Sequence, residues 1–505
     1  MMLGRLKILK QSKDYLSKRG AYLPVILLSS VLFIAYAVAL SSLAFSNVKI
    51  TDLHNKKITS LYLAEAGINY YMWHLAHEPL DYCDGVLDDA DPDNDSKCPN
   101  PSGPGENGPF AHSYYDSDVD DGVREELGAY TLYITPPPPG GTRAQIKSVG
   151  QVRGTTPTRT VIAQIGMPSF SEYTFLSNDT RFRLGPGGVI EGSVYANNNN
   201  QCITSGGFAT WCGFYNEGTI TGDTYSVSAQ TRNPYSPYNI IEEGIVDPDN
   251  GIAGSKNWPV TGVPFEKLKT DLNQFRTLTR DEAKGDYYGE SGQQGYHVKL
   301  EAAGYRMTTV TGIDSAHLTM TAQDPANIDL APLIPYPVES PKEGVIFFED
   351  NIWIEGEIDN VHLTVVAADP DLDPTDTGTK RIYIPNNLTY TEPYDGTDKL
   401  GLIAQRDIFI VDSVPDSMRL DAAMVATAGE AGAYLDCRGT TFNPAKTSAT
   451  LYGSRADTGG GMVCGSTGYG FSTRRYIMDP HNVLTPPPHF PKLYDTYQIL
   501  SWREE

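Results

Sequence analysis

The pattern of apolar and polar positions divides the chain into a helical N-terminal part and a strand-rich remainder. An apolar run occupies residues 21–45, and about 20 such residues suffice for a helix to cross a bilayer. Residues 46–77 contain no Pro, and apolar side chains recur there at three- to five-residue steps. These positions are Ile50, Leu53, Ile58, Leu61, Ala64, Ile68 and Tyr71. We therefore expect one helix over 21–77, about 85 Å long, whose amphipathic half packs on the first domain.

Beyond residue 110 the pattern changes to the alternation of strands. Residues 129–135 and 144–150 alternate apolar and polar side chains, and an apolar strand is predicted at 161–166. We expect a small β module over 78–168, which begins with a loop rich in Asp, Asn, Pro and Gly. Its antiparallel sheet would cover the apolar stripe of the helix.

From residue 170 onward, short apolar strands separated by Gly recur at irregular spacing. Repeated strand and turn units favour a parallel β-helix or solenoid, although a β-sandwich with long loops uses the same residues. We expect a β-rich domain with polar insertions at 169–340, including one helix at 264–277, and a C-terminal β-rich domain at 341–505. The predicted fold class is α+β: a long N-terminal transmembrane helix followed by a β-rich ectodomain that is partly β-helix or solenoid-like.

The distribution of charge predicts where each end of the chain lies. Residues 1–20 carry six basic residues against one acidic residue, a net charge of about +5, whereas the whole chain has a net charge of −23. A basic flank beside an apolar segment stays in the cytoplasm. We therefore expect a single-pass envelope protein with its N-terminus cytoplasmic and everything beyond Phe45 outside. The acidic ectodomain argues against a nucleic-acid partner, which selects basic surfaces.

The basic leader ends in Lys18-Arg19-Gly20 immediately before the apolar run. Three interpretations fit this junction. The run could be a plain membrane anchor, or a secretory signal cut after the small residues Ala37 and Ala39. It could also follow a leader, residues 1–20, that is cut between Gly20 and Ala21, so that the apolar run stays on the mature protein.

The leader, the apolar run and the sequence Ser60-Leu-Tyr-Leu-Ala-Glu-Ala-Gly-Ile68 together resemble the N-terminus of PilX-type minor pilins of type IV pilus systems. The resemblance covers residues 18–75. It implies cleavage by a prepilin peptidase between Gly20 and Ala21. It also implies that other pilin or pseudopilin subunits are partners through the N-terminal helix, in addition to the membrane.

One position departs from the family pattern. Pilins usually carry Glu five residues into the mature chain, where this chain has Val25, preceded by Pro24. The tip pseudopilin of type II secretion also lacks this Glu. The resemblance therefore implies a tip or accessory subunit. Separately, aromatic side chains of the ectodomain make a surface glycan or a protein a candidate ligand and adhesion a candidate role.

A second resemblance covers about residues 340–505 and is to an uncharacterised domain of pilus-associated surface proteins. The segments that carry it are 344–356, 400–404, 421–424 and 476–502. Since that family has no assigned activity, it implies a cellular context and no chemistry. We expect no sortase-type anchor after Trp502.

All six Cys lie beyond the apolar run, and an even number in an exported chain favours disulfides. The simplest pairing joins neighbours, and a zinc site is the alternative, although the chain has no C-x-x-C sequence. The three expected pairs are Cys83 with Cys98, Cys202 with Cys212, and Cys437 with Cys464.

Asp89, Asp91, Asp93 and Asp95 have the alternate spacing of the early ligands of a calcium loop. Asn94 occupies the turn position where Gly is expected, and no Glu follows at the twelfth place. Calcium is therefore the one cofactor that the sequence suggests, and a solvated acidic loop is the alternative. Asp116–Asp121 and Asp369–Asp376 have a similar texture.

The chain contains no G-x-S-x-G, H-E-x-x-H or phosphate-loop motif, and we expect no enzymatic activity. Two alternatives to the pilin interpretation remain, a membrane-anchored carbohydrate-active β-helix enzyme and a plain structural envelope protein. The residues that such an enzyme could use are Glu191, Glu355, Glu357 and Arg381, although alternating surface charge explains them equally. Aromatic side chains that could contact a sugar or a partner are Tyr235, Tyr238, Tyr287, Tyr288 and Tyr296.

Overall fold

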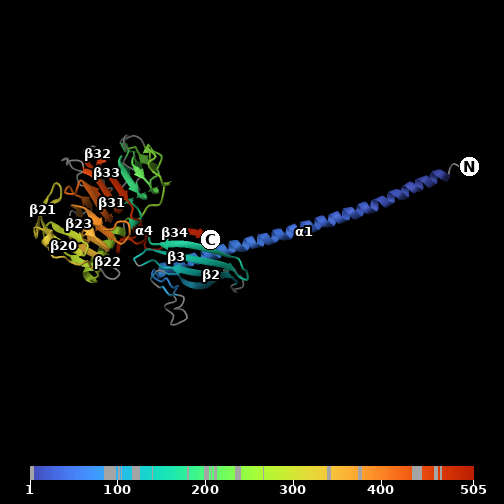
Figure 1. Ribbon diagram of the computed structural model, residues 1–505, viewed down its shortest axis with the longest axis horizontal. Coiled ribbons are helices and arrows are strands. Elements are labelled where there is room, and N and C mark those ends of the chain that lie inside the picture. The colour runs from blue at the N-terminus through green and yellow to red at the C-terminus, as the bar shows by residue number, and fades with distance from the viewer. Residues whose placement is uncertain are drawn as a thin grey trace.

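The structure is a computed structural model in which one long helix projects from a strand-rich body (Figure 1). The residues that it describes are 5–84, 98–100, 103, 105–115, 125–138, 140–178, 181–197, 204–205, 208–209, 213–233, 240–265, 267–337, 343–372, 378–434, 446–459, 465–466 and 469–505. Helix α1 runs from Arg5 to His77, which is about 110 Å at the rise of an α-helix. Together with the strands that follow, α1 confirms the predicted α+β class.

Helix α1 begins earlier than expected. The prediction started the helix at Ala21, but the leader from residue 5 onward is helical as well. That segment contains no Pro and is rich in Leu, Lys and Arg, which are strong helix formers. Its one Gly after residue 5, Gly20, costs only about 1 kcal/mol, which a long helix tolerates.

The first sheet is antiparallel, with the strand order β1-β2-β3-β4-β34. Its strands are β1 (Asn107–Tyr115), β2 (Glu126–Thr135), β3 (Arg143–Val152), β4 (Thr158–Gly166) and β34 (Gln498–Glu504). Buried side chains alternate along β2 and β3, so one face of the sheet packs on the C-terminal half of α1. The strands predicted at 129–135, 144–150 and 161–166 lie within β2, β3 and β4. The fifth strand comes from the end of the chain, outside the expected module at 78–168.

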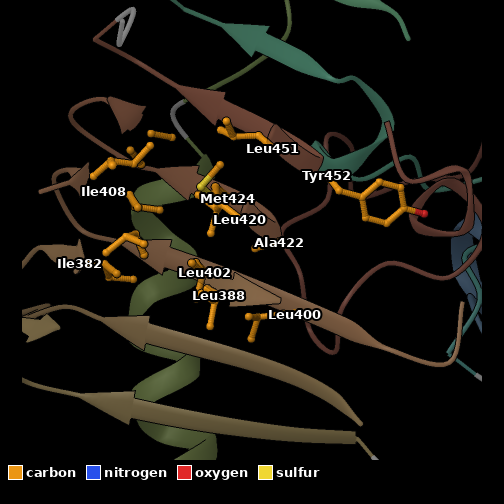
Figure 2. Close-up of a cluster of buried hydrophobic side chains, with 14 of the residues drawn as sticks. Ile382, Leu388, Leu400, Leu402, Ile408, Leu420, Ala422, Met424, Leu451 and Tyr452 are labelled. Atoms are coloured by element: carbon orange, nitrogen blue, oxygen red, sulfur yellow. The ribbon is translucent and has the colours of Figure 1, made fainter. Parts of the chain in front are cut away.

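The body is built from short parallel strands that stack as successive coils, in agreement with the predicted solenoid-like arrangement. One ladder joins β22 (Glu343–Phe348), β24 (His362–Ala367), β27 (Lys399–Ala404), β29 (Ser417–Ala426) and β31 (Lys446–Asp457) in parallel. A second ladder uses β23 (Ile352–Ile358), β25 (Ile382–Ile384), β26 (Leu388–Tyr390), β28 (Ile408–Ile410) and β30 (Ala431–Tyr434). Leu, Ile and Met side chains from both ladders fill the space between them (Figure 2).

The coils do not stack in chain order. The early strands β5 (Phe175–Ser177), β7 (Gly188–Glu191) and β8 (Val194–Ala196) join the late strands β31 and β33 (Tyr469–Ile477). At the other end, β18 (Asp286–Tyr288) pairs with β22, and β19 (Gly295–Glu301) pairs with β23. The pairings therefore cross the expected boundary between 169–340 and 341–505, and both segments belong to one continuous stack.

The remaining elements lie along this stack or project from it. The strands are β6 (Arg181–Leu184), β9 (Thr204–Ser205), β10 (Phe208–Ala209), β11 (Gly213–Asn216), β12 (Thr219–Ile220), β13 (Thr224–Ser226), β14 (Thr231–Arg232), β15 (Ile240–Ile241), β16 (Ile245–Val246), β17 (Lys256–Asn257), β20 (Gly304–Asp314), β21 (Thr319–Asp324) and β32 (Gly465–Ser466). The helical elements are η2 (Phe170–Glu172), α3 (Lys267–Arg276), η3 (Thr277–Asp281), η4 (Ile328–Leu330) and α4 (Pro480–Leu484). Helix α3 is the helix predicted at 264–277.

Candidate functional site: the exposed helix and its junctions

The N-terminal half of α1 carries an apolar surface that none of the residues described in the structure covers. In the part of the chain that the structure describes, α1 is the one helix long and apolar enough to cross a membrane, judged by length and composition. Every described side chain from residue 23 to 55 is exposed. Gly20 and Ala21, the expected cleavage junction, lie inside this helix, and Val25 just beyond them is exposed.

The amphipathic stripe packs on the sheet over a shorter length than expected. Ile50 and Leu53 were expected to belong to it, but their side chains are 64% and 48% exposed. Burial begins at Ser60 and continues along one face of the helix. The buried apolar side chains on this face are Leu63, Ala64, Ile68, Tyr71 and Leu75. The stripe from residue 46 to 58 therefore projects beyond the sheet as an uncovered extension of the membrane segment.

Small residues bring α1 unusually close to the sheet at the start of the buried face. A Cβ added at Gly150 would lie 2.1 Å from the Ser60 carbonyl oxygen and 2.5 Å from the Ala64 nitrogen. A Cβ added at Gly67 would lie 2.3 Å from Ser148 Oγ. Positions 60, 64 and 67 share one helix face. The small residues of the pilin-like motif thus serve close packing against β3.

The other face of the same motif points away from the sheet. Tyr62 is exposed, Glu65 is partly exposed, and Trp73 lies further along the same side of the helix with an exposed ring. Apolar and aromatic side chains on an uncovered helix face are available to a partner. One side of the motif therefore packs on the sheet, and the other side is exposed.

A disulfide and a group of polar contacts fix the end of α1. Cys83 and Cys98 are joined by a disulfide, with Cα atoms 5.5 Å apart, and they form the first of the three expected pairs. The other four Cys lie outside the described residues. Tyr82 and Tyr497 hydroxyls are 2.6 Å apart, and Tyr497 donates to the Pro79 carbonyl at 3.1 Å. Burial raises the pKa of both phenols, so they remain neutral hydrogen-bonding groups.

Two chain segments connect the first sheet to the coil stack, and we call them the neck: residues 166–172 leaving the sheet and residues 479–498 returning to it. They hydrogen-bond to each other, from Phe170 N to Pro491 O at 3.0 Å and from Leu493 N to Pro168 O at 2.7 Å. The Glu172 carboxylate pairs with an Arg side chain of β3. Burial raises the pKa of Glu172, and this Arg partly opposes the rise. The neck is therefore a paired connection in which the two segments brace each other.

The predicted calcium ligands Asp89, Asp91, Asp93 and Asp95 lie outside the described residues. Within the described ranges, no group of three or more His, Cys, Asp or Glu side chains could hold a metal ion. Asp371, from the third acidic segment, accepts two hydrogen bonds from Arg276.

The residues considered for an enzyme are distributed over separate contacts. Glu191 binds Arg475, Glu355 lies 2.9 Å from His297, and Arg381 donates to Asp407. Among the described residues, Glu357 accepts a long hydrogen bond of 3.4 Å from the Thr389 hydroxyl. The four residues named from the sequence are thus tied to different partners and share no common site.

The described tyrosines of the predicted contact surface mostly pack inward. Tyr287 stacks on Phe347 and Tyr288 stacks on Phe348 of β22. Tyr288 and Tyr296 pack against the core between the two ladders, whereas Tyr287 packs against a second apolar cluster. Tyr235 and Tyr238 lie outside the described residues.

Comparison with known proteins finds a distant likeness to a solved structure, but no matching family model or curated protein. Among solved structures, the competence-associated pilin ComZ from Thermus thermophilus aligns over 89% of this chain and 97% of its own, at 13% identity and a TM-score of 0.32. A likeness at this level carries no argument about function, which has to be inferred from the chain's own residues and geometry.

Proposed function

We propose that the chain is a minor pilin-like subunit of a type IV pilus-like assembly, held in the cell envelope by α1 with its body outside. The observation that carries this proposal is the uncovered apolar extension of α1 at residues 46–58. The segment 21–45 is already long enough to cross the hydrocarbon core. Residues 46–58 add about 20 Å of helix, with Val48 and Ile50 side chains that are 66% and 64% exposed.

Neither the bilayer nor the chain's own sheet covers this extension, and soluble surfaces rarely leave large apolar patches open. A plain membrane anchor needs no such segment. Packing of the extension against the helices of neighbouring subunits would remove it from water, and lysines interspersed along it (Lys49, Lys56, Lys57) can face outward. A carbohydrate-active enzyme is not proposed, because its candidate residues are tied to separate partners.

Within the proposed assembly, this chain occupies a tip or another low-copy position. Val25 stands where pilins use a carboxylate to pair with a neighbour's N-terminal amine, and an unpaired amine in the membrane is unfavourable. The coil stack is also bulky relative to the stalk (Figure 1), so subunits that all carried it would crowd one another. Adhesion through the body, to a surface glycan or a protein, remains a prediction.

Photo-crosslinking in cells tests the proposal. A photoreactive amino acid at Leu53, on the uncovered extension, should link the chain to other pilin-like subunits. The matched control is Leu330 on η4, whose side chain is 78% exposed on the body and should give no such product. Links from position 53 to lipid alone, or none, would leave a membrane anchor as the better account.

A further inference from the structure

A lysine side chain is fully buried next to the neck. Lys399 on β27 is only 1% exposed, and ammonium groups are rarely buried unless paired. Its Nζ lies 3.5 Å from Asp479 Oδ2 and 3.3 Å from Asn482 Oδ1. Both partners are buried as well, and they come from the N-cap and the third residue of α4. The three side chains thus form an enclosed group that links the coil stack to the returning segment of the neck.

The Asp479 carboxylate is held in a fixed position. Its Oδ1 accepts hydrogen bonds from the backbone N–H of His481 at 2.9 Å and from the Tyr452 hydroxyl at 3.1 Å. These two donors leave Oδ2 facing Lys399 Nζ. Asp479 therefore presents one carboxylate oxygen to the amine and can take a proton from it.

Asn482 is held in place by its backbone hydrogen bonds, while its side-chain amide nitrogen is unpaired among the described residues. Its N–H donates to the Asp479 carbonyl, and its carbonyl accepts the Ser171 hydroxyl at 3.1 Å. The side-chain Nδ2 has no hydrogen-bond partner among the described residues. Leaving a buried amide N–H unpaired is unfavourable, so structural packing alone does not account for an Asn at this position. An amide whose nitrogen is unbound, and whose carbonyl faces a buried amine, is instead arranged for acyl transfer.

We propose that Lys399 and Asn482 form an intramolecular isopeptide bond, with Asp479 transferring the protons. Asp479 first takes one proton from the Lys399 ammonium. The neutral Nζ then attacks Cγ of Asn482, and a second proton passes from Nζ through the Asp479 carboxyl group to Nδ2. The Nζ–Cγ bond forms as the Cγ–Nδ2 bond breaks, and Nδ2 leaves as ammonia. The ammonia carries away the first proton as ammonium, so Asp479 is regenerated and no oxidant or reductant is needed.

The surroundings of the group favour this step. Burial lowers the pKa of Lys399, although the nearby Asp479 charge opposes the shift, so the neutral nucleophile is easier to reach than in water. Tyr452, whose hydroxyl donates to Asp479, packs edge to face with Tyr390, and the two rings would help to exclude water that competes for the amide.

The position of the bond indicates what it would do. It would tie β27, in the middle of the stack, to α4, whose Asn482 carbonyl already contacts Ser171 of the departing neck segment. The returning segment would then be joined covalently to one coil, and the departing segment would stay linked to it through the Ser171 hydrogen bond. A pull on the body relative to the stalk would meet a covalent link before the returning segment could peel away. The bond itself does not depend on the proposed function.

Mass spectrometry of the full-length chain, purified in detergent and fully reduced, tests the proposal. We expect an intact mass lower by one ammonia than the unlinked sequence, and a tryptic peptide pair joined through Lys399 and Asn482, with no cleavage after Lys399. A full mass with separate Lys399 and Asn482 peptides would overturn the proposal. Loss of one water with a link to Asp479 would overturn the assignment to Asn482.

Two variants separate the roles of the three residues. N482A should retain the unlinked mass, and so should D479N, which keeps a side chain that can cap α4. A normally linked D479N chain would overturn the role given to Asp479. Because the wild-type measurement needs no variant to fold, the bond is tested even if a substitution disturbs α4.

Discussion

The close approach of α1 to the first sheet makes a sharp prediction at Gly150. In G150A the new Cβ would lie 2.1 Å from the Ser60 oxygen, 2.5 Å from the Ala64 nitrogen and 3.0 Å from Leu63 Cβ. The first two atoms belong to the helix backbone and cannot rotate away. Overpacking of this kind typically costs about 1–3 kcal/mol.

The steric clash in G150A could instead be relieved if the helix detached from the sheet. Detachment would expose Leu63, Ile68, Tyr71 and Leu75, which are all buried, at about 1.5–3 kcal/mol for each large side chain. That loss exceeds the overpacking cost several-fold. We therefore expect the helix to stay docked but strained, with the first sheet destabilised by about 2 kcal/mol.

Hydrogen exchange on the full-length chain in detergent micelles measures this strain locally. Since about 1.4 kcal/mol corresponds to a tenfold change, amides of β3 that exchange through opening of the first sheet should exchange roughly 10- to 50-fold faster in G150A, while those of β29 stay unchanged. The matched control is G185A, because a Cβ at Gly185 meets nothing within 4 Å. Protection of β3 in G150A equal to that in G185A and wild type would refute the packing account.

Three further predictions concern the body and the junctions. Y497F removes two hydrogen bonds in a buried site and should lower the free energy of unfolding by about 1–3 kcal/mol, measured by chemical denaturation; an unchanged midpoint would count against the junction. Burial raises the pKa of Asp247, but the Lys256 ammonium at 2.8 Å and other hydrogen bonds lower it more, so the net pKa is below the ordinary value. The stability that this carboxylate contributes is therefore present above about pH 3.9, its pKa in the unfolded chain, and is lost as pH falls through the lower folded pKa. In D247N this part of the acid unfolding transition should disappear. An acid unfolding profile identical to that of the wild type would refute the role given to Asp247. Replacing both Cys83 and Cys98 by Ser opens a loop with a sequence separation of 15 and should cost about 3 kcal/mol, seen as earlier thermal unfolding of the first sheet; equal melting of oxidised wild type and variant would contradict it.

Local periodicity was enough to predict the elements nearest the N-terminus. The apolar run and the stripe after it predict α1, alternation predicts β2 and β3, and a short apolar run predicts β4, because each signal lies within one element. The spacing of Ser60, Ala64 and Gly67 places three small residues on one helix face. That this face packs closely on the sheet could not be predicted, because it depends on Gly150, which is distant in sequence. The apolar stripe predicted a longer contact between helix and sheet than the structure has. Residues 50 and 53 have the right spacing, but they lie past the edge of the sheet.

The features that local sequence patterns could not predict all depend on pairing between strands that are far apart in the chain. Strand β34 joins β4 although more than 300 residues separate them, and β5 stacks on β31. A short stretch of sequence does not indicate which strands will be neighbours, because any apolar strand of similar length can form the same backbone hydrogen bonds. The group of Lys399, Asp479 and Asn482 was missed for the same reason: a Lys on a strand is usually solvated, and its burial here comes from the returning neck.

The mature N-terminus tests the central claim, that α1 belongs to a processed pilin-like subunit, most directly. The protein would be isolated from the envelope of the producing cell and its N-terminal peptide identified by mass spectrometry. We predict that it begins at Ala21, with the apolar run retained. A chain that begins at Leu40, or one that keeps Met1, would contradict the account.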